Sequence, residues 1–292
     1  MSKINTEYLY DKGQADYTFF NWFFGCKNYL AMHYGFWEKD TRNLFAAQQN
    51  QNEYVNKKLN FQPGESILDA GCGVGGTMVY LASNYNLPII GINISSEQIK
   101  KADKYSKKYN VDGLIKFSKQ NFQDTNFPND SFDKIYTIES GGCYANPVNS
   151  FVKEIFRILK PGGQILVVDG FMAKPRKDLD SKNLRRLKKL SDVWGLPETN
   201  TYKYWLSEIR TGGFENVIWE DLTSKIKKTS RIMFVLAVVA GPIWLLLYYL
   251  RFFNKARYSN LMACLRQYKL FKNGSLAYGS IIATKPNISF RA

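Results

Sequence analysis

Short apolar runs alternate with amphipathic stretches from residue 64 to residue 171, and this alternation constrains the fold more strongly than any other feature of the chain. The pattern is typical of βα units arranged around a parallel sheet. The apolar runs predict five strands, at residues 66–70, 88–95, 115–120, 132–140 and 163–171. In an open α/β sheet the ligand binds outside the carboxyl ends of the strands. The loops that follow these strands are therefore the first place to look for a functional site.

A glycine-rich turn, "AGCGVGG", follows the first predicted strand. Gly71, Gly73 and Gly76 form the pattern G-x-G-x-x-G, in which the absent side chains let the backbone approach a nucleotide closely. Alone, the pattern is compatible with a dinucleotide site or with a tight turn that binds nothing. Asp69, just before the first glycine, would repel a pyrophosphate and attract a cationic amino acid. Asn93 stands where a dinucleotide site has an acid for the ribose, so both residues argue against a dinucleotide.

Three segments, "LDAGCGVGG", "FPNDSFDKIY" and "EIFRILKPGGQILVVD", resemble in their order and spacing a class I methyltransferase dependent on S-adenosylmethionine (SAM). The resemblance covers about residues 60–171. It implies an α/β, Rossmann-like fold whose seven-stranded sheet is mostly parallel, with an antiparallel last strand. The segments "ENVIWEDLT" and "YGSIIATKP" are the expected sixth and seventh strands. We therefore expect SAM as the cofactor.

The resemblance also implies which residues contact SAM. The family more often has an acid at positions 93 and 121, although an amide oxygen at position 121 still accepts a hydrogen bond from the adenine amino group. For Asn93 and Gln98, ordinary roles in a loop and at a helix start remain open. The implied contacts are Asp69, Gly71 and Gly73 for the methionine part, Asn93 and Gln98 for the ribose, and Asn121 and Phe122 for the adenine.

Three shorter segments resemble a narrower group, the methyltransferases of sterols, prenyl diphosphates, tocopherols and fatty-acyl chains. They are "MHYGFW" (Met32–Trp37), "GINISSEQI" and "IESGGCYANP". In that group the first segment closes over the methionine end of the cofactor, which implies a contact from Tyr34. The Glu-Ser pair in the third segment resembles the opening of this loop in prenyl-diphosphate and sterol carbon methyltransferases.

Methyl transfer to an alkene carbon generates a carbocation, which must be held until a proton leaves. Aromatic faces stabilise a cation by about 0.5–2 kcal/mol each, and a carboxylate can then remove the proton. Glu139, at the end of the fourth strand, is the candidate base, and its alternative role is to anchor a backbone N–H or the cofactor. His33, the only histidine, is a second catalytic candidate. The candidate ring-wall residues of the substrate pocket are Trp22, Trp37, Tyr144 and Trp244.

Residues Ile232–Leu250 form a run without a single charge, between the predicted sixth and seventh strands. These two strands could not share a sheet if the run crossed a bilayer once. Gly241 and Pro242 at its centre predict two short helical pieces. We therefore expect no transmembrane helix, but an apolar helical insertion, residues 224–275, that lines an acceptor pocket. Two alternatives remain open: a core helix packed on the sheet, and an outer face that dips into a membrane surface.

The N-terminal part is rich in aromatic residues, which make up 12 of the 30 residues from Tyr8 to Trp37. This enrichment predicts an α-helical cap, residues 1–60, on a methyltransferase domain, residues 61–292. The N-terminus lacks the apolar stretch of a secretory signal, so the chain is expected to be cytoplasmic, free or peripheral at a membrane. No metal site is expected, because the cysteines lack metal-ligand spacing: Cys26, Cys72, Cys143 and Cys264.

The net charge of +15 predicts an anionic partner. Eight Lys or Arg residues against two Asp lie between Lys174 and Leu190. A solvated helix face, a rim that binds a diphosphate, and attraction to an anionic membrane surface remain open as explanations. Mg²⁺ is expected only if the acceptor is a diphosphate. Nucleic acid is not expected as a partner, because no recognition module is visible.

These features predict a SAM-dependent methyltransferase that acts on a carbon of an isoprenoid acceptor, such as a prenyl diphosphate or a related lipophilic alkene. Oxygen or nitrogen methylation of a lipophilic small molecule or lipid headgroup remains open. So does a SAM-binding protein that docks to a membrane or a partner without catalysis. The sequence does not indicate an oligomeric state.

Overall fold

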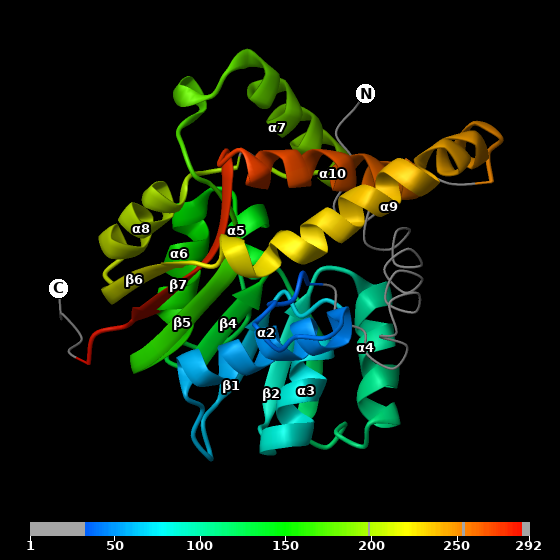
Figure 1. Cartoon of the computed structure of the whole chain (residues 1–292). Helices are drawn as coiled ribbons and strands as arrows, with labels where there is room; N and C mark the ends of the chain where they lie inside the picture. Colours follow the sequence, from blue (N-terminus) through cyan, green and yellow to red (C-terminus); the bar gives the residue numbers. More distant parts are fainter. Residues whose placement is uncertain (1–32, 198, 253–254, 288–292) are drawn as a thin grey trace.

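The computed structural model describes residues 33–197, 199–252 and 255–287, and its strands form one seven-stranded sheet (Figure 1). The order across the sheet is β3-β2-β1-β4-β5-β7-β6. β7 pairs antiparallel with both neighbours, whereas the other paired strands are parallel. The predicted sheet, mostly parallel with an antiparallel last strand, is confirmed. The strands are β1 (Ile67–Ala70), β2 (Ile89–Asn93), β3 (Ile115–Lys119), β4 (Phe132–Ile138), β5 (Leu159–Met172), β6 (Glu215–Asp221) and β7 (Leu276–Thr284).

Helices cover both faces of this sheet, which explains why its central strands are apolar almost throughout. One core lies against α2, α3 and α4, and a second lies against α6 and α8. A further group, α7, α9 and α10, lies over the carboxyl ends of the strands (Figure 1). The helices are α2 (Leu44–Leu59), α3 (Gly76–Tyr85), α4 (Ser96–Lys108), α5 (Gly141–Tyr144), α6 (Val148–Ile158), η1 (Arg176–Asp178), α7 (Ser181–Trp194), α8 (Tyr202–Thr211), α9 (Thr223–Tyr249) and α10 (Lys255–Lys272).

Local capping sets where the loops near the carboxyl ends of the strands stop. The Ser95 side chain accepts a hydrogen bond from Gln98 N at 3.1 Å and so caps α4 directly after β2. Gly195 ends α7 in the left-handed conformation, with φ of 63°, which glycine adopts without a steric penalty. These caps fix where α4 begins after β2 and where α7 ends beside the cavity.

The insertion between β6 and β7 is confirmed as an apolar helical hairpin, made of α9 and α10. The prediction that Gly241-Pro242 would divide the apolar run is wrong, because α9 continues through Pro242 to Tyr249. Pro242 lies on the exposed side of the helix, where carbonyl groups can tilt outward to water. The packing of α10 along α9 continues beyond the proline, since the rings of Tyr248 and Tyr258 stack at 4.7 Å. This packing supports a single helix.

The predicted N-terminal cap falls mostly outside the described residues. Its described part is the segment from His33 to Asn43 and α2, and Val55 and Leu59 of α2 belong to the same core as β1 and α3. A division of the chain at residue 60 stays a prediction.

Candidate active site

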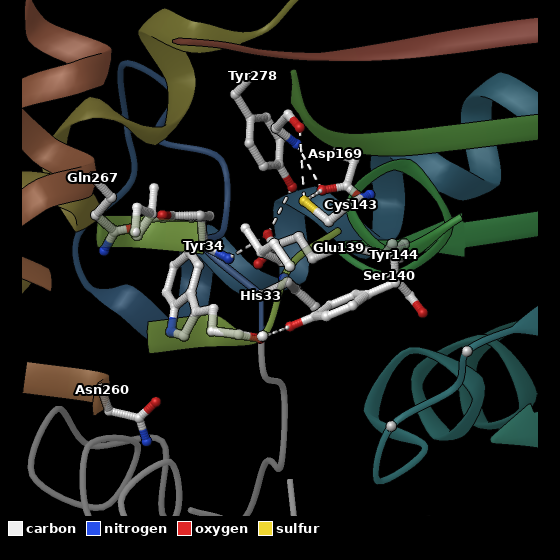
Figure 2. Close-up of a pocket in the computed structure, with 18 of the residues that line it drawn as sticks. His33, Tyr34, Glu139, Ser140, Cys143, Tyr144, Asp169, Asn260, Gln267 and Tyr278 are labelled. Atoms are coloured by element: carbon white, nitrogen blue, oxygen red, sulfur yellow. Dashed lines mark hydrogen bonds between the residues drawn. The ribbon is translucent and has the colours of Figure 1, made fainter. Parts of the chain in front are cut away.

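A cavity of about 740 Å³ lies at the carboxyl ends of the central strands, below α7, α9 and α10. The loops after β1, β2, β3 and β4 contribute to its lining, together with Asp169 and Gly170 near the end of β5. Its polar part surrounds the glycine loop, and its apolar part lies between the three helices. Figure 2 shows the centre, where side chains from the N-terminal segment, β4, β5 and β7 converge.

The glycine loop after β1 is held tightly against its neighbours. Gly71 N and Cys72 N both donate to Ile92 O at 3.0 Å, which ties the loop to β2. Gly71 has φ of 99°, and a Cβ there would collide with the Ser140 hydroxyl. Glycine is therefore required at this position by both backbone conformation and space. The result is a backbone edge that lines the cavity and that a ligand can approach closely.

Asp69, the next-to-last residue of β1, lines the cavity and is only 4% exposed. Burial raises the pKa of its carboxyl to about 7, although a hydrogen bond with Tyr136 works in the opposite direction. A buried carboxylate without a nearby cation gains most from a positively charged ligand. This environment fits the predicted partner, the amino group of the methionine part of SAM.

The structure gives Asn93 a role within the protein. Its Nδ2 donates to Gly73 O at 3.1 Å and to Gln98 Oε1 at 2.8 Å, while its Oδ1 accepts from Ser95 N at 3.0 Å. The side chain thus joins the glycine loop to the start of α4. Asn93 and Gln98 both line the cavity, and their contact with a ribose stays a prediction.

Asn121 and Phe122 line the cavity beyond β3. Asn121 Oδ1 accepts a hydrogen bond from Gln123 N at 3.0 Å and so shapes the turn. The Phe122 ring packs edge-on against Phe151, with centroids 5.4 Å apart. This packing holds the Phe122 ring in the cavity wall, and an adenine contact with Asn121 and Phe122 stays a prediction.

Glu139 lies directly after β4, at the junction of the two parts of the cavity (Figure 2). Its backbone has φ of 49°, a conformation that is uncommon for residues other than glycine and that clusters at functional sites. Its Oε1 accepts hydrogen bonds from Tyr34 N at 2.9 Å and from the Tyr278 hydroxyl at 2.7 Å. Burial raises the pKa of Glu139 to about 8, and the two donors partly oppose that rise. The carboxyl therefore holds its proton at neutral pH in most molecules and ionises as the pH rises through about 8.

Gln51 and Tyr278 complete this network and are absent from the sequence prediction. Gln51 Nε2 donates to the Tyr278 hydroxyl at 2.9 Å. A signal for Gln51 does exist, because three polar residues share the buried face of α2 with Val55: Gln48, Gln51 and Asn52. Polar groups on an apolar helix face require buried partners.

His33 lies in the cavity wall next to this network. Its Nδ1 is 3.1 Å from Gln51 Oε1, which also accepts a hydrogen bond from Gly35 N at 2.7 Å. Since that oxygen acts as an acceptor, Nδ1 carries the histidine proton. Burial lowers the pKa of His33 to about 4, so the ring is neutral at physiological pH. Direct catalytic participation by His33 stays a prediction.

Asp169 at the end of β5 is a third buried acid in the cavity, and the sequence prediction lacks it. Its Oδ1 is 2.6 Å from Cys143 Sγ, and its Oδ2 accepts from Cys143 N at 3.0 Å. Burial raises the pKa of Asp169 to about 6. Among the described residues, no Lys or Arg lines the cavity. The cavity therefore favours a cationic ligand over an anionic one.

The apolar part of the cavity follows the inner face of α9, defined by Thr229, Met233, Leu236, Ala237, Ala240 and Trp244. Its first and last residues are separated by about 22 Å along a helix that rises 1.5 Å per residue. Of the predicted ring-wall residues, Tyr144 and Trp244 line the cavity. Trp37 Nε1 donates to Thr229 Oγ1 at 2.8 Å, and the Lys228 ammonium lies over its ring, so Trp37 contacts α9. Its contact with an acceptor stays a prediction. Trp22 lies outside the described residues.

The sheet order, the antiparallel β7 and the glycine loop after β1 define a class I SAM-dependent methyltransferase. Tyr34 lines the cavity in the segment expected to cover the cofactor, and its direct contact with SAM stays a prediction. The chain belongs to the mycolic acid cyclopropane synthetase family, whose model matches residues 2–213.

The similar curated proteins include a sterol 24-C-methyltransferase and a cycloartenol-C-24-methyltransferase. The chain is 32% identical over 179 residues to the sterol 24-C-methyltransferase ERG6 of Saccharomyces cerevisiae, a match that covers 61% of this chain and 46% of that enzyme. It is 32% identical over 173 residues to the cycloartenol-C-24-methyltransferase of Arabidopsis thaliana, covering 59% and 51%. The match thus spans about half the length of these relatives.

Solved structures share the fold across nearly the whole chain. The cyclopropane synthase MmaA2 of Mycobacterium tuberculosis superposes with a TM-score of 0.79 at 18% identity, covering 97% of this chain and 99% of that one. A geranyl diphosphate C-methyltransferase of Streptomyces coelicolor, solved with Mg²⁺, a substrate thio-analogue and S-adenosylhomocysteine, gives 0.71 at 17% identity, covering 96% of each. At these identities the likeness concerns the fold.

Proposed function

We propose that this chain is a SAM-dependent C-methyltransferase whose acceptor is an uncharged lipophilic alkene of the isoprenoid class. The observation that carries this proposal is the position of Glu139, a buried carboxylate between the glycine loop and the apolar part of the cavity. When bound, SAM supplies an electrophilic methyl group on its sulfonium sulfur. The buried acids Asp69 and Asp169 favour such a cationic ligand.

The reaction forms one carbon–carbon bond and breaks one carbon–sulfur bond. The π pair of the acceptor forms the bond to the methyl carbon, and the carbon–sulfur pair remains on sulfur. The second alkene carbon then carries the positive charge. Glu139, in its ionised form, takes a proton from an adjacent carbon, and the carbon–hydrogen pair forms a new double bond. The proton thus ends on Glu139, and the acceptor product is neutral.

Aromatic rings stand beside Glu139 to hold the positive charge meanwhile. Tyr34 packs edge-on against Tyr278 at 5.5 Å and against Phe271 at 6.1 Å, and all three line the cavity. Aromatic faces attract cations, and more strongly in a desolvated site. The apolar residues that α7, α9 and α10 turn toward the cavity exclude water that would otherwise capture the cation.

The lining favours an uncharged acceptor over a prenyl diphosphate. A diphosphate would bring negative charge next to Asp69, Glu139 and Asp169, and no Lys or Arg among the described residues lines the cavity to offset it. Within the described ranges, no group of three His, Cys, Asp or Glu side chains lies close enough together to hold a metal ion. The exposed Lys182, Arg185, Lys188 and Lys189 lie on the side of α7 away from Leu187 and Leu190, which line the cavity.

A panel of acceptors tests the proposal with the purified protein and methyl-labelled SAM. The panel contains a sterol with a side-chain alkene, geranyl diphosphate with Mg²⁺, and phosphatidylethanolamine. We expect methyl transfer to carbon of the sterol and little transfer to the others. If geranyl diphosphate were methylated faster than the sterol, the proposal of an uncharged acceptor would be overturned. Label on the amine nitrogen of phosphatidylethanolamine would overturn the proposal of carbon methylation. SAM binding without transfer to any lipophile would favour a docking protein without catalysis.

A further inference from the structure

The helix α9 has two apolar faces, and its cavity lining uses only one of them. The other, the outer face, consists of exposed residues at helical spacing on one side of α9 and at the tip of the hairpin. Val239 is 71% exposed, Ile243 63% and Tyr249 76%. The complete outer face is Val235, Val238, Val239, Ile243, Leu246, Tyr249, Leu250 and Phe252.

This concentration of exposed apolar residues is specific to the hairpin. Of the 12 exposed large hydrophobic residues in the described chain, eight belong to the outer face. Only 11% of the most apolar window of α9 is buried, whereas a core helix packed on the sheet would be mostly buried. Contiguous exposed apolar patches mark surfaces that bind a partner.

The charge of the hairpin selects the kind of partner. From Thr223 to Ser275 the sequence contains ten Lys or Arg residues and no Asp or Glu. Lys227, Arg231 and Arg251 are exposed at the two ends of the outer face. An apolar strip with cationic ends and no acid matches the interface of an anionic bilayer, where the strip enters the acyl region and the cations meet the headgroups.

The base of α9 restricts how deeply the hairpin can enter. The helix is long and apolar enough to cross a membrane by length and composition alone. However, Thr229 Oγ1 donates to Tyr34 O at 2.7 Å, and Lys225 pairs with Glu38 at 2.7 Å. The hairpin also begins at β6 and returns to β7, which are adjacent strands of one sheet. A spanning orientation would break these contacts, whereas a helix lying in the interface keeps them.

We propose that the α9–α10 hairpin docks this protein on an anionic lipid surface through the outer face of α9. The acceptor then passes from the lipid around α9 to the inner face of the same helix. The docking step stands on the exposed face and the charge, and the acceptor route rests on the proposed function. Figure 1 shows the hairpin projecting beyond the sheet, which leaves its tip accessible to a flat surface.

Vesicle co-sedimentation tests the docking with the full chain. The probes are phosphatidylcholine vesicles with and without phosphatidylserine. Val239→Asp with Ile243→Asp places two charges on the outer face, and Ile218→Asp with Tyr204→Asp places two charges on exposed residues of β6 and α8. We expect the wild type and the control pair to bind anionic vesicles about tenfold more strongly than the outer-face pair. Equal binding by all three proteins would overturn the proposal.

Two further measurements separate the remaining outcomes. If the outer face joins two copies of the chain, light scattering will show a dimer that the outer-face pair converts to a monomer, without vesicle binding, and docking is overturned. The second measurement compares turnover of an acceptor in detergent and in vesicles. If the outer-face pair keeps turnover in detergent but loses it in vesicles, this result supports the passage of the acceptor from the lipid around α9. Vesicle binding without turnover in either medium would contradict the proposed function and leave docking supported.

Discussion

The Tyr278 hydroxyl donates a 2.7 Å hydrogen bond to Glu139 Oε1 and thereby joins the last strand of the sheet to the end of β4. The two residues are 139 positions apart in the sequence. The oxygen of the same hydroxyl accepts a hydrogen bond from Gln51 Nε2, so the hydroxyl proton of Tyr278 is free to point to Glu139. The bond stabilises the ionised carboxylate and fixes its orientation below the apolar part of the cavity.

Tyr278→Phe should slow turnover about tenfold, because it removes one hydrogen bond to a charged group. The loss of a donor also raises the pKa of Glu139 further, so the rising limb of the pH–rate profile should move to higher pH. Tyr54→Phe is the matched control, since the Tyr54 hydroxyl bonds Glu220 outside the cavity lining. A lower rate with an unmoved pH profile would reduce Tyr278 to a packing role.

Glu139→Gln retains the shape of the side chain and removes its charge. Loss of a general base lowers rates typically by about 10²–10⁴-fold, so we expect a drop of more than a hundredfold with nearly normal SAM affinity. Glu215→Gln, at an exposed position of β6, is the control. Single-turnover kinetics and calorimetry separate the two effects. Weak SAM binding in this variant would make Glu139 a cofactor ligand instead.

The pH dependence of stability should also report Glu139. Its folded-state pKa of about 8 lies above the ordinary value of 4.5, so the folded protein binds more protons than the unfolded chain between these values. Its contribution to stability is complete below pH 4.5 and is lost as the pH rises through 8. His33, with its pKa lowered to about 4, acts in the opposite direction below pH 6.5.

Above pH 6.5 the His33 contribution no longer changes, and the loss of the Glu139 contribution remains. The melting temperature of the SAM-free protein should therefore fall between pH 6.5 and 8. Asp69, with a pKa of about 7, contributes to the lower half of this fall. Glu139→Gln should flatten its upper half. An unchanged slope in this variant would show that Glu139 ionises without a shift.

Asp69→Asn should weaken SAM binding by about 10- to 100-fold, the typical effect of losing a hydrogen bond to a charged group. The fold should persist, because the amide has the same shape as the carboxyl. Asp112→Asn, at an exposed position before β3, is the control. Calorimetric titration measures both, and equal affinities would remove Asp69 from the cofactor site.

A peripheral hairpin should release the protein from membranes in carbonate or high salt. The contacts of Thr229 and Lys225 at the base of α9 keep both ends of the hairpin on one side. Added protease should therefore reach both termini of protein bound to sealed vesicles. Protection of one terminus alone would demonstrate a spanning helix.

The sequence by itself determined the sheet and its ligand-binding edge. The alternation of apolar and amphipathic segments depends on local periodicity, and the glycine loop depends on local backbone space at Gly71, so both are legible without a structure. The same holds for Glu139, which the end of a predicted strand places at the carboxyl edge.

Only the tertiary structure decided what surrounds Glu139. Tyr278 and Asp169 reach the cavity from β7 and β5, and Gln51 of α2 bonds the Tyr278 hydroxyl behind them. No local pattern pairs residues so far apart. Packing likewise joined Trp37 to Thr229 of α9 and carried α9 through Pro242. The physical reason is that periodicity reports which side of an element is buried, whereas the partner on that side depends on how distant elements pack together.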